Sequence, residues 1–291
     1  MLIFEPENHK YVSADSSDNT LWVSVTTLVS FFKQPFDAKK ISERSSKKKS
    51  TTNKWYGMDP VEIQNVWKAE SKRATDLGTW YHNQREMDLT SCETIERHGT
   101  VLPVVKPITN DKGYKIAPSQ KLIPGIYPEL LVFLRSVGIC GQSDLVEIVN
   151  DSIFITDYKT NKEIKTQSFV NWEGVKQKMK TPLSHLDDCN YYHYALQLSI
   201  YMYIIQKHNP KLKPGGLTLH HIIFETDGED NFGYPITRLT PQGDPIVREV
   251  IFYELPYLKD EVMTLLQWYK EPQNQSIILE HIKSKKNEAT V

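Results

Sequence analysis

The fold is decided by the stretch Gly141-Gln142-Ser143-Asp144-Leu145-Val146-Glu147-Ile148-Val149-Asn150-Asp151-Ser152-Ile153-Phe154-Ile155-Thr156-Asp157-Tyr158-Lys159. Both halves are rich in β-branched and other apolar residues, a composition typical of β-strands. Between them lies Asn150-Asp151, a dipeptide that tolerates the left-handed backbone conformation of tight turns. The stretch therefore predicts a β-hairpin.

The length of the hairpin loop determines which residues face each other. A two-residue or four-residue loop centred on Asn150-Asp151 places Asp144 opposite Asp157, whereas a three-residue loop would break this register. Because side chains alternate along a strand, one face then carries Asp144, Val146, Ile148, Ile153, Ile155, Asp157 and Lys159. We expect this face to point into the core, with both carboxylates and the lysine at its open end.

The predicted carboxylate pair is unfavourable unless a cation lies between its members. Facing Cβ atoms are about 5 Å apart, and two negative charges at that distance repel by roughly 3 kcal/mol at an effective dielectric constant of ~20. Mg²⁺ or Mn²⁺ would convert this repulsion into binding, since carboxylate oxygens suit hard cations. Lys159 adds the ammonium that phosphodiester hydrolysis can use. Alternatively, one aspartate lies at the rim and only makes turn or cap hydrogen bonds.

The motifs Gly141-x-x-Asp144 and Asp157-Tyr158-Lys159 resemble the core of the PD-(D/E)XK nucleases, particularly the RecB-like branch. That branch carries a histidine on an earlier helix and Gln-x-x-x-Tyr on a later one. Here these are the segments Gly78–His82 and Gln197–Tyr201, in the expected order. Ser24–Leu28 also resembles the start of phage-type and mitochondrial genome-maintenance exonucleases. The resemblance spans roughly residues 1–205.

The resemblance implies roles for individual residues. The implied metal ligands are His82, Asp144, Asp157 and the main-chain carbonyl of Tyr158, around one or two Mg²⁺ or Mn²⁺ ions. Asp144, Asp157 and Lys159 form the implied catalytic core. Gln197 and Tyr201 would position the DNA strand, and residues four apart do share a helix face. Glu129, on the preceding strand, would support the metals or their waters.

Plainer interpretations exist for several of these residues. A histidine such as His82 is more often a surface or hydrogen-bonded core residue than a ligand. Gln197 and Tyr201 could simply pack within a tyrosine-rich helix. His220-His221 suggests zinc, but adjacent residues of a strand point to opposite faces, so we discount such a site.

Composition narrows the function classes. A net charge of −1 means that DNA binding would need a local basic surface. The lysine-rich stretch 39–54 predicts a solvated loop or a mobile arm that touches phosphates. Cys92, Cys140 and Cys189 are too few for the four-cysteine iron–sulfur cluster of some relatives, so no cluster is expected. There is no phosphate-binding loop, so ATP is not expected as a partner.

The sequence also predicts where the protein resides. The start Met1-Leu2-Ile3-Phe4-Glu5-Pro6 lacks the pattern of a signal peptide, and no apolar stretch is long enough to cross a membrane. We expect a soluble cytoplasmic protein, in the host cytoplasm if it is phage-encoded, without membrane association.

We expect an α/β fold with a central mixed β-sheet flanked by α-helices, a PD-(D/E)XK (restriction-endonuclease-like) core. Predicted helices run through 26–32, from Asp59-Pro60 to about 72, over 78–89, from about 186 to 208 behind a capping box of Ser184 and Asp187, and over 258–269. Residues 98–128 read as irregular, and the tail after 273 as frayed. One nuclease domain spans 1–291, with a helical elaboration at about 24–90, a catalytic core at about 127–255 and a C-terminal helix and tail at about 256–291.

The predicted activity is metal-dependent hydrolysis of DNA phosphodiesters. By family likeness, the preferred mode is exonuclease action on single-stranded or frayed duplex ends. A structure-selective endonuclease is the enzymatic alternative, and a catalytically idle nuclease fold that only binds DNA is the alternative from another class. The polarity of digestion and any protein partners do not follow from the sequence.

Overall fold

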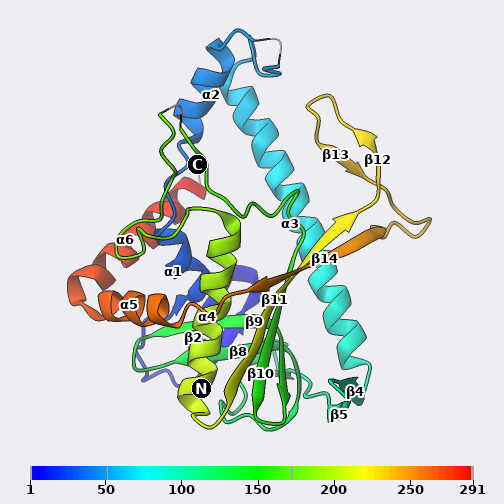
Figure 1. The fold of residues 1–291 in the computed structure, drawn as a ribbon, viewed down its shortest axis with the longest axis vertical. Helices are drawn as coiled ribbons and strands as arrows, with labels where there is room; N and C mark the ends of the chain where they lie inside the picture. Colours follow the sequence, from blue (N-terminus) through cyan, green and yellow to red (C-terminus); the bar gives the residue numbers. More distant parts are fainter. Residues whose placement is uncertain (1, 51, 172, 290–291) are drawn as a thin grey trace.

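A mixed β-sheet lies at the centre of the protein, in a computed structural model that describes residues 2–50, 52–171 and 173–289 (Figure 1). The strand order is β14-β11-β10-β9-β3, and β8 also pairs with β9. β10–β11 and β3–β9 are parallel, whereas the other pairs are antiparallel. The strands are β3 (Val23–Ser24), β8 (Gly125–Leu134), β9 (Ile139–Val149), β10 (Ser152–Lys159), β11 (Lys213–Phe224) and β14 (Val247–Leu255). The predicted α/β class is confirmed.

The hairpin of β9 and β10 has the register that the sequence predicts. Val149 pairs with Ser152, and the ladder continues to Leu145 opposite Thr156. Asn150 in the turn has a φ of 53°, the left-handed conformation expected for this dipeptide. Beyond the ladder, the next facing positions are Asp144 and Asp157.

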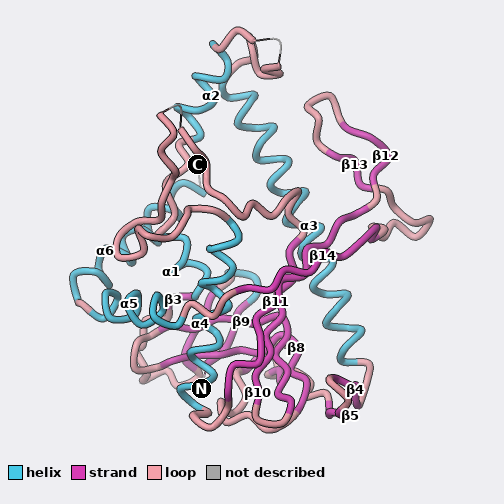
Figure 2. The backbone as a smooth tube through the Cα atoms, in the orientation of Figure 1, coloured by secondary structure: helices cyan, strands magenta, loops and turns pink. Residues whose placement is uncertain are grey.

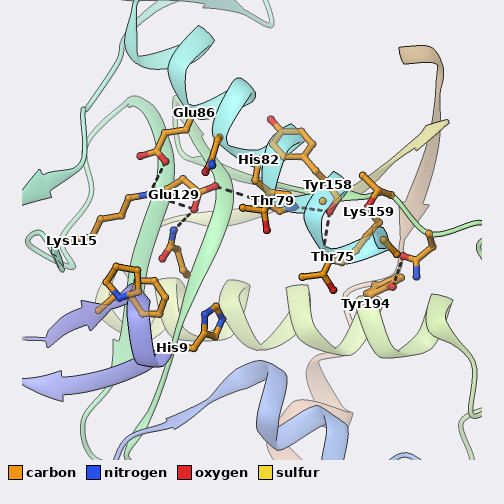
Figure 3. A pocket seen from close by; sticks show the side chains of 18 of the residues that line it. His9, Thr75, Thr79, His82, Glu86, Lys115, Glu129, Tyr158, Lys159 and Tyr194 are labelled. Atoms are coloured by element: carbon orange, nitrogen blue, oxygen red, sulfur yellow. Dashed lines mark hydrogen bonds and ion pairs between the residues drawn. The ribbon is translucent and has the colours of Figure 1, made fainter. Parts of the chain in front are cut away.

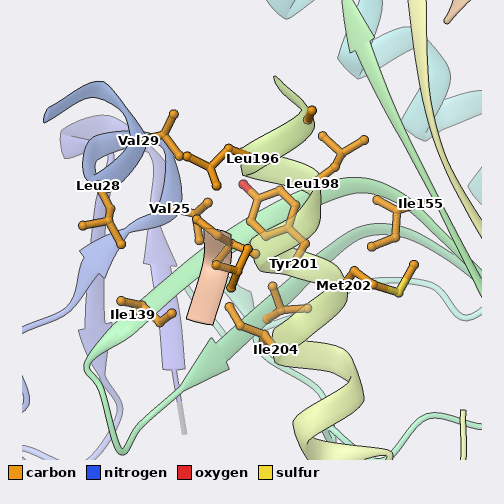
Figure 4. Packing of buried hydrophobic residues seen from close by; sticks show 14 of the residues in the cluster. Val25, Leu28, Val29, Ile139, Ile155, Leu196, Leu198, Tyr201, Met202 and Ile204 are labelled. Carbon is orange, nitrogen blue, oxygen red and sulfur yellow. The ribbon is translucent and has the colours of Figure 1, made fainter. Parts of the chain in front are cut away.

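The two faces of the sheet pack against different helices (Figures 2 and 4). The main core joins Val146, Ile148, Ile153 and Ile155 to α1 (Val25–Phe31), α4 (Asn190–His208), α5 (Lys259–Lys270) and α6 (Pro272–Ala289). On the opposite face, Leu145, Val149 and Tyr158 pack with residues of α3 (Pro60–Thr90). α4 buries ten consecutive or near-consecutive positions, as expected for a helix that is apolar on most sides.

α3 is one continuous helix of 31 residues, where the sequence predicts two. Its predicted gap is bridged by the ion pairs Lys72–Asp76 at 2.8 Å and Arg73–Glu70 at 2.7 Å, and such spacings stabilise a helix. Gly78 lies inside it because the helix passes close to the end of β10. A Cβ at this position would lie 3.3 Å from Thr160 Oγ1.

Three other predictions of secondary structure are wrong. α4 begins at Asn190, and its N-cap Cys189 makes no side-chain cap bond. Asp187 instead pairs with Lys178 at 2.5 Å, so Ser184 and Asp187 form no capping box there. Residues 39–47 of the basic stretch belong to α2 (Ala38–Lys47), which the Asp37 side chain caps. The tail is helical as α6, anchored by the buried Ile278. Residue 51 of the basic stretch and residues 290–291 of the tail lie outside the described residues.

Small sheets surround the central one. The first has the order β2-β1-β7-β6, so the region predicted as irregular contributes strands to it. The remaining strands are β1 (Leu2–Glu5), β2 (Lys10–Ser13), β4 (Thr94–Arg97), β5 (Thr100–Pro103), β6 (Ile108–Thr109), β7 (Lys115–Ile116), β12 (Thr226–Glu229) and β13 (Pro235–Thr237), with a 3-10 turn at Pro6–Asn8. Among the described helices, none has the length and apolar character needed to span a membrane.

Gly141 should be required for core packing. A Cβ here would lie 2.6 Å from Cε1 of Tyr201, whose ring is fully buried. We expect Gly141→Ala to lower the free energy of unfolding by about 1–3 kcal/mol, measured by chemical denaturation. Gly216→Ala is the control, because its new Cβ would make only a 3.4 Å contact with Phe154. Equal losses in both variants would contradict the packing argument.

Candidate active site

Three neighbouring strands bring three carboxylates into one row, of which Figure 3 shows Glu129 beside His82. Glu129 lies on β8, Asp144 on β9 and Asp157 on β10. Pro128 pairs with Leu145 and Leu130 with Ser143, so Glu129 lies opposite Asp144. Glu129 also has a φ of 51°, uncommon for a residue other than glycine. A third strand, β8, thus adds a carboxylate to the two of the predicted hairpin.

His82 of α3 reaches two members of this row. Its Nδ1 lies 3.5 Å from Asp144 Oδ1 and 3.8 Å from Glu129 Oε1. Its Nε2 lies 3.1 Å from the main-chain carbonyl oxygen of Tyr158. The ligand atoms of His82, Glu129 and Asp144 all lie within 4.8 Å of one another. This set of carboxylate oxygens and an imidazole nitrogen suits a divalent cation such as Mg²⁺ or Mn²⁺.

Asp157 lies beside this group and has different partners. Its Oδ2 forms an ion pair with the Lys159 ammonium, while Gln197 of α4 donates a hydrogen bond of 3.2 Å to its Oδ1. Lys159 also donates to the Tyr158 carbonyl at 3.2 Å, and its Nζ lies 5.1 Å from the ring centroid of Tyr194. The ammonium therefore lies between Asp157 and the oxygen that His82 contacts.

Burial and charge shift the titration of these groups. Burial raises the pKa of Asp157 to about 6, against the opposing effect of Lys159. Burial also raises the pKa of Asp144. Burial would lower the pKa of His82, but the charges of Asp144 and Glu129 outweigh it and raise that pKa to about 9. Asp157 and Asp144 likewise outweigh burial at Lys159 and raise its pKa, so the ammonium stays charged. Clustered shifts of this kind are typical of functional sites.

An open cavity of about 890 Å³ gives access to the site. Its wall is formed by the N-terminal hairpin, α3, the end of β10 and α4, through residues that include His9, Thr75, Thr79, Lys159, Asn161 and Tyr194 (Figure 3). The volume lies within the usual range for ligand pockets, about 300–1,000 Å³.

Three further polar residues surround Glu129, and the sequence analysis missed them. Gln142 donates a hydrogen bond to Glu129 Oε2. Lys115 Nζ lies 3.7 Å from the same oxygen and 2.7 Å from Glu86 Oε2. Glu86 follows His82 by one helical turn, a spacing that could have revealed it. Lys115 lies on a short strand in a region that carried no pattern.

The remaining candidates divide between the site and the core. Gln197 joins the site through Asp157. Tyr201 has 2% exposure, does not line the cavity, and lies against Gly141. His220 and His221 point to opposite faces as expected: His220 lies against Phe252, and His221 Nε2 lies 2.6 Å from the Asn161 carbonyl oxygen.

The sequence profile of the PD-(D/E)XK nuclease superfamily matches residues 36–289. The chain therefore belongs to this superfamily, whose members are metal-dependent nucleases that act on nucleic acid. No curated protein matches the sequence. A solved structure titled "Crystal structure of SSO0001" is similar at 15% identity and a TM-score of 0.32, over 91% of this chain and 80% of that one.

Metal binding should release a proton. At pH 7–8 the metal-free site holds His82 protonated, because its pKa is about 9, whereas a metal ligand must be neutral. We expect about one proton to be released per Mn²⁺ bound, and the affinity to fall about tenfold per pH unit below this pKa. Below pH 6, protonation of Asp157 should weaken binding further, since its pKa is about 6.

Calorimetry in buffers of different ionisation enthalpy measures this release. His82→Asn should abolish it, whereas His185→Asn, at an exposed residue paired with Glu261, should leave it unchanged. Unchanged proton release in His82→Asn would show that another group titrates.

Proposed function

We propose that this nuclease hydrolyses DNA phosphodiesters as an exonuclease acting on single-stranded or frayed ends. The observation that carries the proposal is the convergence of Asp144 and Asp157 with His82 and Lys159, the last two of which line one open cavity. Gln197 adjoins the same group. The order of these motifs also supports the RecB-like branch, with its phage-type and mitochondrial exonucleases, as the relevant relatives. We further propose that the described elements form one nuclease domain.

In this proposal, some residues hold the metal and Lys159 acts on the reacting groups. His82, Asp144 and the Tyr158 carbonyl, with Glu129 and Asp157, would hold Mg²⁺ or Mn²⁺. Such an ion supplies Lewis-acid stabilisation of charge on a phosphate. Lys159 remains an ammonium, so it acts as a cation and hydrogen-bond donor toward the nucleophile or the developing oxyanion. It cannot accept a proton while charged, which argues against a role as general base.

α4 has a positioning role in this proposal. The Gln197 amide fixes Asp157 by donating to Oδ1 at 3.2 Å, without adding a charge beside the acid. Tyr201 acts one turn further on by packing against Gly141 of the strand that carries Asp144. We therefore assign Tyr201 to support of the strand, and direct contact with DNA to residues of the cavity wall such as Tyr194 and Asn161.

Two other functions remain as alternatives. A structure-selective endonuclease would use the same residues, and differs only in whether a free end is needed. An idle DNA-binding module would have no need of the Asp157–Lys159 pair, which lies in the site with Asp157 only 2% exposed. Burying such charged groups is costly without a functional reason.

The proposal is tested by cleavage of end-labelled linear and closed circular DNA, single- and double-stranded, with Mg²⁺, Mn²⁺ or EDTA. We expect metal-dependent loss of linear substrates only, and at least about a hundredfold lower rate for Asp157→Ala, as for removal of one major catalytic group. Asp157→Ala should still bind DNA, because it removes a negative charge near phosphate. Cutting of circles would indicate the endonuclease, and binding without any cleavage the idle module.

We also propose that one divalent ion binds per chain, because Lys115 takes the place of a second. Its ammonium lies between Glu86 and Glu129, at 2.7 and 3.7 Å. The other oxygen of Glu129 faces His82. An ammonium and a divalent ion could not occupy this gap together.

Removing the Lys115 charge should open a second metal site. Calorimetry of Mn²⁺ binding should give one ion for the wild type and a second, weaker ion for Lys115→Met. Lys106→Met is the matched control, since Lys106 forms its ion pair with the exposed Glu93, away from the carboxylate row. Two ions in the wild type, or one in both proteins, would refute this role of Lys115.

A further inference from the structure

A second cavity, of about 400 Å³, lies on the opposite face of the same strands. Its floor is formed by side chains of β9, β10, β11 and β14. Its sides come from Tyr81 and Arg85 of α3 and from Arg97 and His98 of the β4–β5 hairpin. None of these residues takes part in the metal site, although Tyr158 contributes to both cavities.

The floor of this cavity carries polar groups beside apolar ones. Glu147 and Thr156 are each only 7% exposed. Among the described residues, neither the Thr156 hydroxyl, the Thr218 hydroxyl nor the His220 ring has a hydrogen-bond partner. A face packed only for stability would be apolar, whereas these polar groups line a cavity that solvent or a ligand can enter. Ile222 and Phe224, further along β11, follow that rule.

Flat aromatic surfaces border the polar floor. Phe252 is 65% exposed although it is a large apolar ring, and it packs edge-to-face with His220 at 4.6 Å. The His98 ring stacks on Phe154 with centroids 4.5 Å apart. An exposed ring beside a polar cavity is the arrangement on which nucleobases stack.

The guanidiniums at the cavity offer hydrogen-bond donors to a phosphate. Arg85 and Arg97 both line it, and each has a carboxylate partner: Arg85 Nη1 lies 3.0 Å from Asp88 Oδ2, and Arg97 pairs with the lining Glu147. Arg97 uses Nε for Glu147 at 2.6 Å and Nη1 for a main-chain carbonyl, so Nη2 is still available to a phosphate oxygen.

We propose that this cavity binds a single nucleotide unit. The base would lie against Phe252 and hydrogen-bond the polar floor, and the phosphate would meet Arg85 and Arg97. The unit could be a free mononucleotide or an unpaired nucleotide of a bound strand, since both present the same chemistry. This proposal goes beyond the nuclease function and does not depend on cleavage.

The test measures binding of 5′-dAMP, deoxyadenosine and a short single-stranded oligo(dA) in EDTA, where the metal site cannot contribute. Phe252→Ala should weaken nucleotide binding about tenfold or more, the range expected for loss of one base-stacking contact. Ile251→Ala is the matched control, because it lies next to Phe252 on β14 and points to the other face. It should change affinity less than twofold.

Thr218→Val gives a second, nearly isosteric variant in case Phe252→Ala alters the fold. It should also weaken binding, and deoxyadenosine should bind less tightly than 5′-dAMP because it lacks the phosphate. Dependence of 5′-dAMP binding on Phe252 and Thr218 would identify a site for free mononucleotides. The same dependence for oligo(dA) alone would identify a strand subsite. Unchanged affinity of both ligands in both variants would overturn the proposal. Because cleavage is measured separately with Mg²⁺, that outcome would leave the nuclease function intact.

Discussion

The row of carboxylates across β8, β9 and β10, with Asp144 and Asp157 buried, determines which elements must lie around it. Each facing pair would repel by roughly 3 kcal/mol without compensation. Two positively charged side chains compensate this repulsion: His82 on α3 and Lys159 at the end of β10. α3 must therefore pass close to β10, and this explains why a glycine, Gly78, occupies the point of contact at Thr160.

The partners of the carboxylates differ in charge according to their place. Gln142 and Gln197 are neutral amides that orient Glu129 and Asp157 through single hydrogen bonds. Amide donors fix a carboxylate without the repulsion that a fixed cation would exert on a metal ion. Lys115, in contrast, is a cation, and it lies 3.7 Å from the Glu129 oxygen that faces away from His82. Lys115 thus supplies positive charge beside Glu129, as Lys159 does beside Asp157.

The hairpin and its register could be predicted because they depend on local chemistry, namely alternation along two strands and a turn at Asn150. The superfamily followed from the same residues and is confirmed by the profile match. The role of Lys115 could not be predicted in this way. Its strand is short, and only the folded structure brings the lysine to Glu86 and Glu129. The burial of Tyr201 also depends on packing across the sheet, since its spacing from Gln197 fits either an exposed or a buried face.

Tyr158 and α3 link the two cavities physically. The Tyr158 carbonyl meets His82 on the metal side, while its side chain lines the second cavity. On α3, His82 and Glu86 line the first cavity, and Tyr81 and Arg85 line the second. A ligand that displaces the Tyr158 backbone through its ring would also move an oxygen proposed to hold the metal. By thermodynamic reciprocity, metal binding would then change nucleotide affinity by the same factor, so the two sites of this sheet would act as one coupled system.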